Sequence, residues 1–275
     1  MPVNFVVVPQ WQGSGSSRAM RLVDGTDAIL EDLPSTATRV VPVPLEAGDE
    51  QGTGIARYGS ILVVRERMRE LIGDLTDPVI TIGGDCGVSL AAIEHALEQA
   101  EGDLAVVWFD AHPDLNTPTS SPSGVFGGMV LRTLAGDGPE GLVPSTVLPR
   151  DRIVLAGTRS VDPGEQEFMA EAGISPVSVD KLESPKALLA AIKATGATSV
   201  YLHIDLDVLD PAEITGVSYP IPFGLTATGL IDLIKSVTSK YPLVGATIAQ
   251  FAPPSPEEAV DDLPTILRII GALTA

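Results

Sequence analysis

The strongest constraint on the fold is a regular alternation of short, β-branched apolar runs with longer segments of helical periodicity. Strand-like runs are predicted at residues 3–8, 38–43, 79–82, 104–109, 153–156, 199–206 and 244–248. Helical spacing is found between them, at residues 61–72, 88–101, 164–172, 184–194, 226–240 and 263–273. Such alternation is typical of a mainly parallel sheet with helices on both faces, a three-layer α/β fold. Because ligands bind at the carboxyl ends of the strands in such sheets, we expect functional residues to follow strand ends.

Length and composition predict one domain over residues 1–275. The chain is 44% hydrophobic, which is enough for a large core. Its 36 acidic and 17 basic residues give a net charge of −19, and no Lys/Arg-rich run is present, so nucleic acid is not an expected partner. No stretch approaches the roughly 20 apolar residues of a membrane-spanning helix, so no membrane association is expected. The single cysteine, Cys86, and the absence of a basic leader predict a cytoplasmic protein.

The apolar run at residues 104–109 leads directly into three side chains that bind metals, Asp110, His112 and Asp114. If the chain stays extended, the period of two places all three on one side. Carboxylates with one imidazole suit Mn²⁺ or Mg²⁺ and tolerate Zn²⁺ or Fe²⁺. Taken alone, however, the motif is as consistent with ordinary polar residues at a strand end.

A second pair of acids, Asp205 and Asp207, ends the apolar run of YLHIDLD. Two strands that both end in paired acids would repel each other unless a cation lies between them. A shared metal site is therefore the preferred interpretation. His203 has the same strand parity but lies one step further from the strand end, so we expect it to hydrogen-bond to a ligand rather than to coordinate a metal.

Cys86 follows a third strand end, directly after Gly83, Gly84 and Asp85. The glycines let the backbone pass close to another group, and Asp85 could cap the following helix. Cys86 is either a small buried hydrophobe or a metal-bound thiolate, and the sequence leaves both open. In the second case we expect removal of the metal to leave a reactive thiolate.

Four spaced motifs, GGDC, DAHPDLNTP with SPSG, DPGE and HIDLDVLDP, together resemble the ureohydrolase family of arginases and agmatinases. The middle two are closer to those of arginases, and the resemblance extends from about residue 83 to residue 254. It implies an α/β/α sandwich around a mainly parallel eight-stranded sheet. It also implies a binuclear manganese site, with one or two Mn²⁺ per chain, a small guanidino substrate, and a homo-oligomer, either a trimer or a hexamer.

The resemblance also implies which residues bind the metals. The implied ligands are Cys86, Asp110, His112, Asp114, Asp205 and Asp207. Asp110 and Asp205 would bridge the two metals. His112 and Asp207 would belong to one metal, and Asp114 to the other. Asp114 and His112 would form the catalytic centre, where Asp114 passes a proton from the attacking water to the departing amine.

The substrate pocket implied by the resemblance is that of an α-amino acid. Asn116 and Ser123 match positions that hold the α-carboxylate, and Asp162 matches the position near the α-amino group. Without the resemblance, Asp162 in Asp-Pro-Gly would be an ordinary turn residue. The products would be urea, or a substituted urea, and an amine.

The chain departs from the family pattern at four positions. Cys86 replaces the histidine of GGDH, and Gly127 replaces the histidine proposed as a proton shuttle. Gln250 replaces the glutamate that holds the guanidinium, and Phe223 replaces a glycine of the Pro-Gly-Gly-Leu loop. Two functions are therefore compatible with the sequence: an amidinohydrolase for L-arginine or N-hydroxy-L-arginine, or a catalytically impaired relative that binds a metal or an amino acid in a structural role. Release of urea or a substituted urea by the manganese-loaded protein would separate them.

Overall fold

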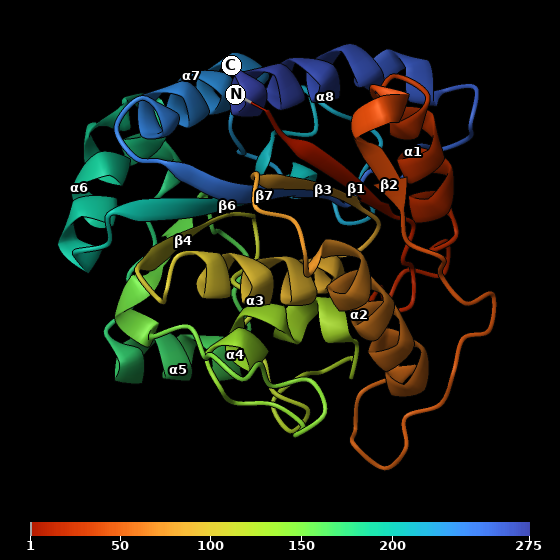
Figure 1. The fold of residues 1–275 in the computed structure, drawn as a ribbon. Helices are drawn as coiled ribbons and strands as arrows, with labels where there is room; N and C mark the ends of the chain where they lie inside the picture. Colours follow the sequence, from red (N-terminus) through yellow and green to blue (C-terminus); the bar gives the residue numbers. More distant parts are fainter. Residues whose placement is uncertain (1) are drawn as a thin grey trace.

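The computed structural model describes residues 2–275 and contains a seven-stranded sheet in which all pairings are parallel (Figure 1). The strand order is β2-β1-β3-β7-β6-β4-β5. The strands are β1 (Asn4–Val8), β2 (Thr38–Val40), β3 (Val79–Gly83), β4 (Leu104–Phe109), β5 (Ile153–Ala156), β6 (Ser199–Asp205) and β7 (Leu243–Ala249). Because β4 and β6 are neighbours, the acidic residues that follow them emerge side by side.

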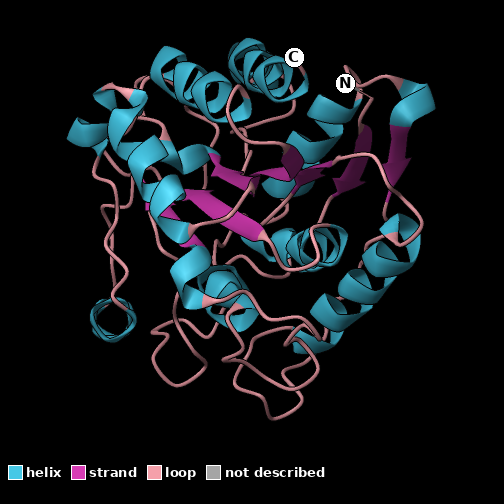
Figure 2. Cartoon of the chain, turned by 60° about the vertical axis from the view of Figure 1, so that its left-hand side comes forward, coloured by secondary structure: helices cyan, strands magenta, loops and turns pink. Residues whose placement is uncertain are grey.

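Helices cover both faces of the sheet, so the predicted three layers are present (Figures 1 and 2). One face carries α1 (Arg21–Leu30), α6 (Pro185–Thr195), α7 (Ala227–Thr238) and α8 (Ala259–Thr274). The other carries α2 (Tyr58–Ile72), α3 (Ser89–Gln99), α4 (Val130–Leu134) and α5 (Pro163–Ala172). Within residues 2–275, no helix has both the length and the apolar character needed to cross a bilayer.

Side chains alternate between the two faces of each strand, so each strand contributes to the core on both sides of the sheet. In β4, Val107 and Phe109 pack toward α6 and α7, whereas Val106 and Trp108 pack toward α3 and α4. A strand that is buried on both faces is continuously apolar, which is why LAVVWF shows no polar alternation.

The sheet has seven described strands, not the eight that the family resemblance implies. Beyond β5, only Val177 pairs with the sheet, through a single bridge to Ala156. A 3-10 helix at Val179–Glu183 follows almost at once and ends any extension of the pairing. β2 is also shorter than predicted, because Pro42 has no N–H to donate and interrupts the ladder.

Helix α1 is not predicted by the sequence analysis, in part because Gly25 interrupts its pattern. The structure gives this glycine a packing role, since an added Cβ would lie 2.1 Å from the carbonyl oxygen of Phe251. Phe251 follows β7, so the absence of a side chain at Gly25 allows α1 to lie directly against the chain that leaves the central strand.

We predict that Gly25→Ala lowers the free energy of unfolding by about 1 to 3 kcal/mol, because the extra methyl group overpacks this contact. Gly271→Ala is the matched control, since Gly271 also lies inside a helix but has no neighbouring atom within 4 Å of an added Cβ. That substitution should raise the free energy of unfolding by up to about 1 kcal/mol through helix propensity. Urea unfolding of both variants measures the two effects, and equal changes would show that α1 does not make this contact.

Candidate functional site

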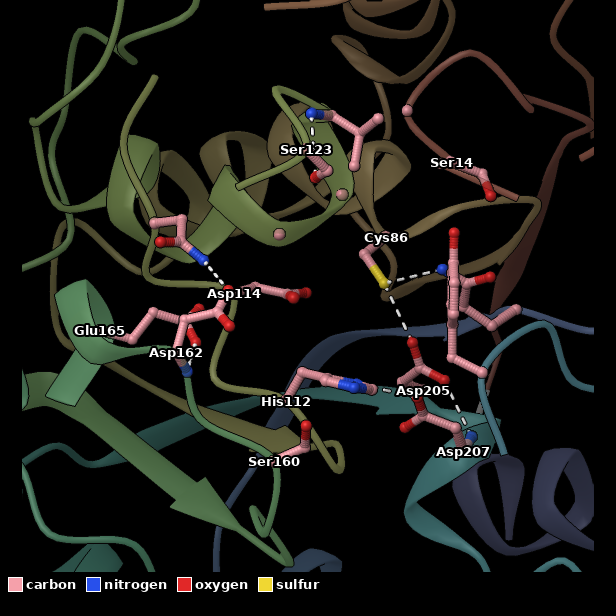
Figure 3. A pocket seen from close by; sticks show the side chains of 18 residues that line it. Ser14, Cys86, His112, Asp114, Ser123, Ser160, Asp162, Glu165, Asp205 and Asp207 are labelled. Atoms are coloured by element: carbon pink, nitrogen blue, oxygen red, sulfur yellow. Dashed lines mark hydrogen bonds and ion pairs between the residues drawn. The ribbon is translucent and has the colours of Figure 1, made fainter. Parts of the chain in front are cut away.

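A pocket of about 430 Å³ opens at the carboxyl ends of the strands (Figure 3). Among its lining residues are nine of the ten predicted site residues: Cys86, His112, Asp114, Asn116, Ser123, Asp162, Asp205, Asp207 and Gln250. The tenth, Asp110, is fully buried and contacts this group from the end of β4. Segments far apart in the sequence thus meet in one place, as expected for residues that follow the carboxyl ends of parallel strands.

The ends of β4 and β6 repeat the same local structure. Phe109 pairs with Ile204 in register, so Asp110 and Asp205 follow side by side. In each case the carboxylate accepts a hydrogen bond from the backbone N–H two residues later: His112 N donates to Asp110 at 2.6 Å, and Asp207 N donates to Asp205 at 2.8 Å. The chain therefore turns at both acids.

The residues after β4 do not remain extended, so the parity argument for Asp114 is wrong. Asp114 has a φ of +50°, in the left-handed region that non-glycine residues rarely adopt. Its carbonyl oxygen accepts hydrogen bonds from Leu131 N and Arg132 N at 3.1 and 3.2 Å, which hold this conformation against the start of α4. The side chain reaches the centre because of this turn, and its Oδ2 is buried without a hydrogen-bond partner.

The potential ligand atoms form two groups, each with all its atoms within 4.8 Å of one another. One group contains Asp110, His112 and Asp207, and the other contains Cys86, Asp110, Asp114 and His203. Asp110 belongs to both groups, as a ligand that bridges two metals would. Binding itself stays a prediction for all of these residues.

Asp205 lies beside the second group rather than within it. Its Oδ2 accepts a hydrogen bond from Cys86 Sγ at 3.0 Å. Cys86 is buried, and the amide nitrogen of Gln250 lies 3.6 Å from its sulfur. In the absence of a cation, burial and the charges of Asp205 and Asp114 raise the pKa of this thiol well above its ordinary value. Burial and the carboxylates thus favour the neutral thiol, which argues against the expected reactive thiolate after metal removal.

The charges of the site also require a cation or bound protons. Burial and the nearby charge of Asp207 raise the pKa of Asp110 to about 7. Burial opposes protonation of His112, but its hydrogen bonds and ion pairs with Asp110 and Asp207 outweigh that effect and raise its pKa to about 12. The buried, unpaired Oδ2 of Asp114 adds an acceptor without a donor. This oxygen-rich donor set with imidazole therefore fits a divalent cation.

The part of the pocket that contains Asn116 and Asp162 is built around Glu165, which the sequence analysis does not single out. One of its oxygens accepts from Leu115 N and the other from Asp162 N, both at 2.9 Å. Glu165 therefore ties the loop after β4 to the start of α5. Asn116 Nδ2 donates to Asp162 Oδ2 at 2.9 Å, whereas Ser123 lies on an exposed loop at the rim. The Asp-x-x-Glu spacing of a helix capping box is the sequence signal that could have identified Glu165.

An N-terminal loop occupies the region where Gly127 lacks a side chain. Gly127 N donates to Gly13 O at 2.9 Å, and a Cβ at Gly127 would lie 3.0 Å from that oxygen. Asp85 holds the loop, since it accepts hydrogen bonds from Gly13 N and the Gln10 side chain. It also accepts from Gly87 N and so caps the 3-10 helix Cys86–Val88 rather than α3, whose N-cap is Val88. The sequence contains no local signal that residues 13–15 would line this pocket.

We predict that the chelated protein loses stability as the pH rises from about 4 to 7. The pKa of Asp110 is raised from its ordinary value of 3.8 to about 7, so the folded protein binds a proton that the unfolded chain releases. This contribution is complete below pH 3.8 and is lost as the pH rises through about 7. Urea unfolding at pH 5 and pH 8 measures the loss.

Asp110→Asn should flatten this pH dependence, and a divalent cation should stabilise the unmodified protein more at pH 8 than at pH 5. An Asp110→Asn variant with an unchanged pH profile would show that the buried carboxylates do not control it.

Comparison of the sequence with known proteins gives consistent matches. The profile of the Arginase family matches residues 15–263. An arginase of Staphylococcus aureus is 32% identical over 219 residues, which cover 73% of this chain and 72% of that protein. An N(omega)-hydroxy-L-arginine amidinohydrolase of Streptomyces lavendulae is 29% identical over 267 residues, which cover 94% of each.

The fold matches solved structures over nearly its whole length. The crystal structure of Entamoeba histolytica arginase in complex with L-ornithine aligns with a TM-score of 0.87 and covers 99% of this chain and 98% of that one. The sequence identity in this alignment is 24%, so the likeness concerns the fold. It confirms the arginase-like α/β architecture that the motifs imply.

Proposed function

The chain belongs to the arginase family and is a hydrolase of C–N bonds in amidines, and we propose that its substrate is an amino acid with a weakly basic guanidino group. N-hydroxy-L-arginine is the preferred candidate and L-arginine a slower substrate. The observation that carries this proposal is that the pocket contains a neutral amide, Gln250, beside Cys86, and an acidic group, Asp162, beside Asn116. The amide would face the guanidino group, and Asp162 would face the α-amino group. The name of the Streptomyces lavendulae relative supports the choice.

The amino-acid end of the pocket consists of Asn116, Asp162 and Ser123. Asp162 can accept a hydrogen bond from an α-ammonium group, while Asn116 and Ser123 can donate to an α-carboxylate. Asn116 Nδ2 already donates one proton to Asp162, and its second amide proton is available to a carboxylate, so a ligand without a carboxylate forgoes this hydrogen bond. Agmatine, which lacks that carboxylate, is therefore expected to be a poor substrate.

The guanidino end is formed by Gln250. Its Oε1 is buried and accepts no hydrogen bond, so it can accept one from a substrate N–H. A neutral acceptor holds a fully charged guanidinium less strongly than a carboxylate would, because charge-assisted hydrogen bonds are roughly twice as strong as neutral ones. An N-hydroxyl group lowers the basicity of the guanidino group and thus matches this amide better.

We further propose that Asp110, Asp205, His112, Asp207 and Asp114 hold divalent cations, with manganese as the expected metal. When bound, the cations lower the pKa of water and supply a nucleophile near neutral pH. Asp114 is placed to accept the proton of the attacking water and deliver it to the departing amine, since its Oδ2 is buried and has no other partner.

Proton exchange with solvent needs a route that does not involve a histidine at position 127. Gly127 lines the pocket but has no side chain to carry a proton. The polar pocket lining admits water, which can relay protons between Asp114 and bulk solvent.

We also propose that the protein assembles as a trimer or hexamer, which sedimentation of the purified protein would test.

We predict that N-hydroxy-L-arginine is hydrolysed faster than L-arginine and that agmatine is scarcely hydrolysed. Gln250→Glu should shift the ratio of kcat/KM toward L-arginine by about tenfold or more, since a carboxylate favours the charged guanidinium by at least 1.4 kcal/mol. Gln166→Glu, on the exposed surface of α5, makes the same chemical change outside the pocket and controls for overall charge.

A competition assay that scores urea against hydroxyurea measures this ratio. Agmatine as the best substrate, or a ratio that both variants leave untouched, would show that the pocket has been assigned wrongly. No release of either product from the metal-loaded protein would favour the alternative of a non-catalytic relative.

We predict that Asp162→Asn raises KM for the amino-acid substrate by about tenfold or more, because it removes a charged acceptor for the α-ammonium group. Asparagine is as good an N-cap as aspartate, and the Glu165 bond to the backbone N–H of residue 162 is kept, so α5 should remain stable. Glu167→Gln, which removes an exposed charge from the same helix, should leave KM unchanged. Equal KM values in the two variants would exclude a role for Asp162 in substrate binding.

A further inference from the structure

His203 is a fully buried histidine in β6 for which the proposed mechanism has no use. Its ring stacks on Trp108, its partner in register on β4, with 3.5 Å between ring centroids and 11° between planes. Its Nδ1 lies 2.8 Å from Ser89 Oγ on α3. The ring is therefore fixed on one side by stacking and at one nitrogen by a hydrogen bond.

The second ring nitrogen of His203 has no partner. Nε2 is buried without a hydrogen bond and lies 3.9 Å from Asp110 Oδ2. The same oxygen of Asp110 already accepts a hydrogen bond from Trp108 Nε1 at 3.0 Å. A buried nitrogen without a partner costs roughly 1 to 3 kcal/mol, so its position at this acidic cluster requires an explanation.

The surroundings of Nε2 are those of a ligand atom. It belongs to the group in which Cys86, Asp110 and Asp114 each offer an atom within 4.8 Å of all the others. If Ser89 Oγ accepts the Nδ1 proton, Nε2 carries a free lone pair. Histidines that bind metals usually donate their other ring N–H to such an oxygen, which fixes the tautomer.

We propose that His203 coordinates a divalent cation through Nε2, together with Asp110 and Asp114, on the Cys86 side of the site. The imidazole that the family pattern places after β3 is thus supplied by β6, while Cys86 takes its position in the sequence. The inference rests on the proposed metal centre and replaces the expectation that His203 only hydrogen-bonds to a ligand.

The proposal predicts a mixed set of ligands for this cation. Nitrogen from His203 joins carboxylate oxygens, with the Cys86 sulfur close by. Such a set suits Co²⁺ and Zn²⁺ better than an all-oxygen site would, and imidazole partly offsets the poor match of sulfur to Mn²⁺. Both cation positions would then contain one imidazole each.

The decisive experiment counts coordinated imidazoles in the full-length protein. The chain has three histidines, and among the described residues His112 and His203 belong to the two ligand groups whereas His95, in α3, belongs to neither. We expect pulsed electron paramagnetic resonance of the Mn²⁺-loaded His112→Asn variant to show ¹⁴N coupling from one remaining imidazole. Absence of that coupling in a variant that still binds Mn²⁺ would overturn the proposal.

A second measurement uses Co²⁺ titration of the chelated protein, followed by absorption spectroscopy and metal analysis. His203→Gln should weaken one of the two Co²⁺ sites by at least tenfold and change its ligand-field spectrum. His95→Gln is the matched control and should change neither. Equal Co²⁺ affinities and spectra in folded His203→Gln and unmodified protein would also overturn the proposal.

The two proposals fail in different ways. If the unmodified protein binds neither Mn²⁺ nor Co²⁺, the metal centre itself is wrong. If it binds them and the imidazole count is one where two are expected, only the assignment of His203 is wrong. Should His203→Gln fail to fold, the ¹⁴N measurement on His112→Asn decides alone, because that variant leaves the buried ring in place.

Discussion

The site depends on the repulsion between carboxylates that the parallel sheet brings together. Asp110 and Asp205 leave neighbouring strands in register, and both are buried. Asp114 and Asp207 join them from the following turns. Negative charges in so small a buried volume require either bound protons or a cation. The raised pKa of Asp110 corresponds to the first case, in which the carboxylate takes up a proton. A divalent cation provides the second, and it would also set the reactivity of any water held there.

The rest of the fold holds this strained arrangement in place. Arg159 donates to the carbonyl oxygens of Asp207 and Ile221 at 2.8 and 2.7 Å, so it fixes the turn after β6 against a distant loop. Glu165 does the same for the loop after β4, which it joins to α5. Both residues act through hydrogen bonds to backbone groups of the loops that carry the candidate ligands.

Three of the departures from the family pattern each occur together with a second feature of the site. Cys86 occurs together with His203, a buried imidazole in the same ligand group. Gly127 occurs with the Gly13 loop, whose carbonyl oxygen would contact even a single added carbon atom. Gln250, in turn, contacts the Cys86 sulfur. Each of these three residues therefore lies against another part of the site.

The sequence by itself determines the α/β class, most strand positions and the identity of the acidic ligand candidates. These follow from local causes: buried strands are continuously apolar, and functional residues in parallel sheets follow strand ends. Only the tertiary structure decides that Asp114 reaches the centre through a left-handed turn, that Glu165 and the Gly13 loop complete the pocket, and that Cys86 lies against Asp205. The free nitrogen of His203 is likewise visible only in the structure. Strand parity gives the side of the sheet on which a residue lies. A hydrogen bond or a vacant lone pair depends instead on atoms from segments far apart in the sequence, such as Ser89 and His203, which are 114 residues apart.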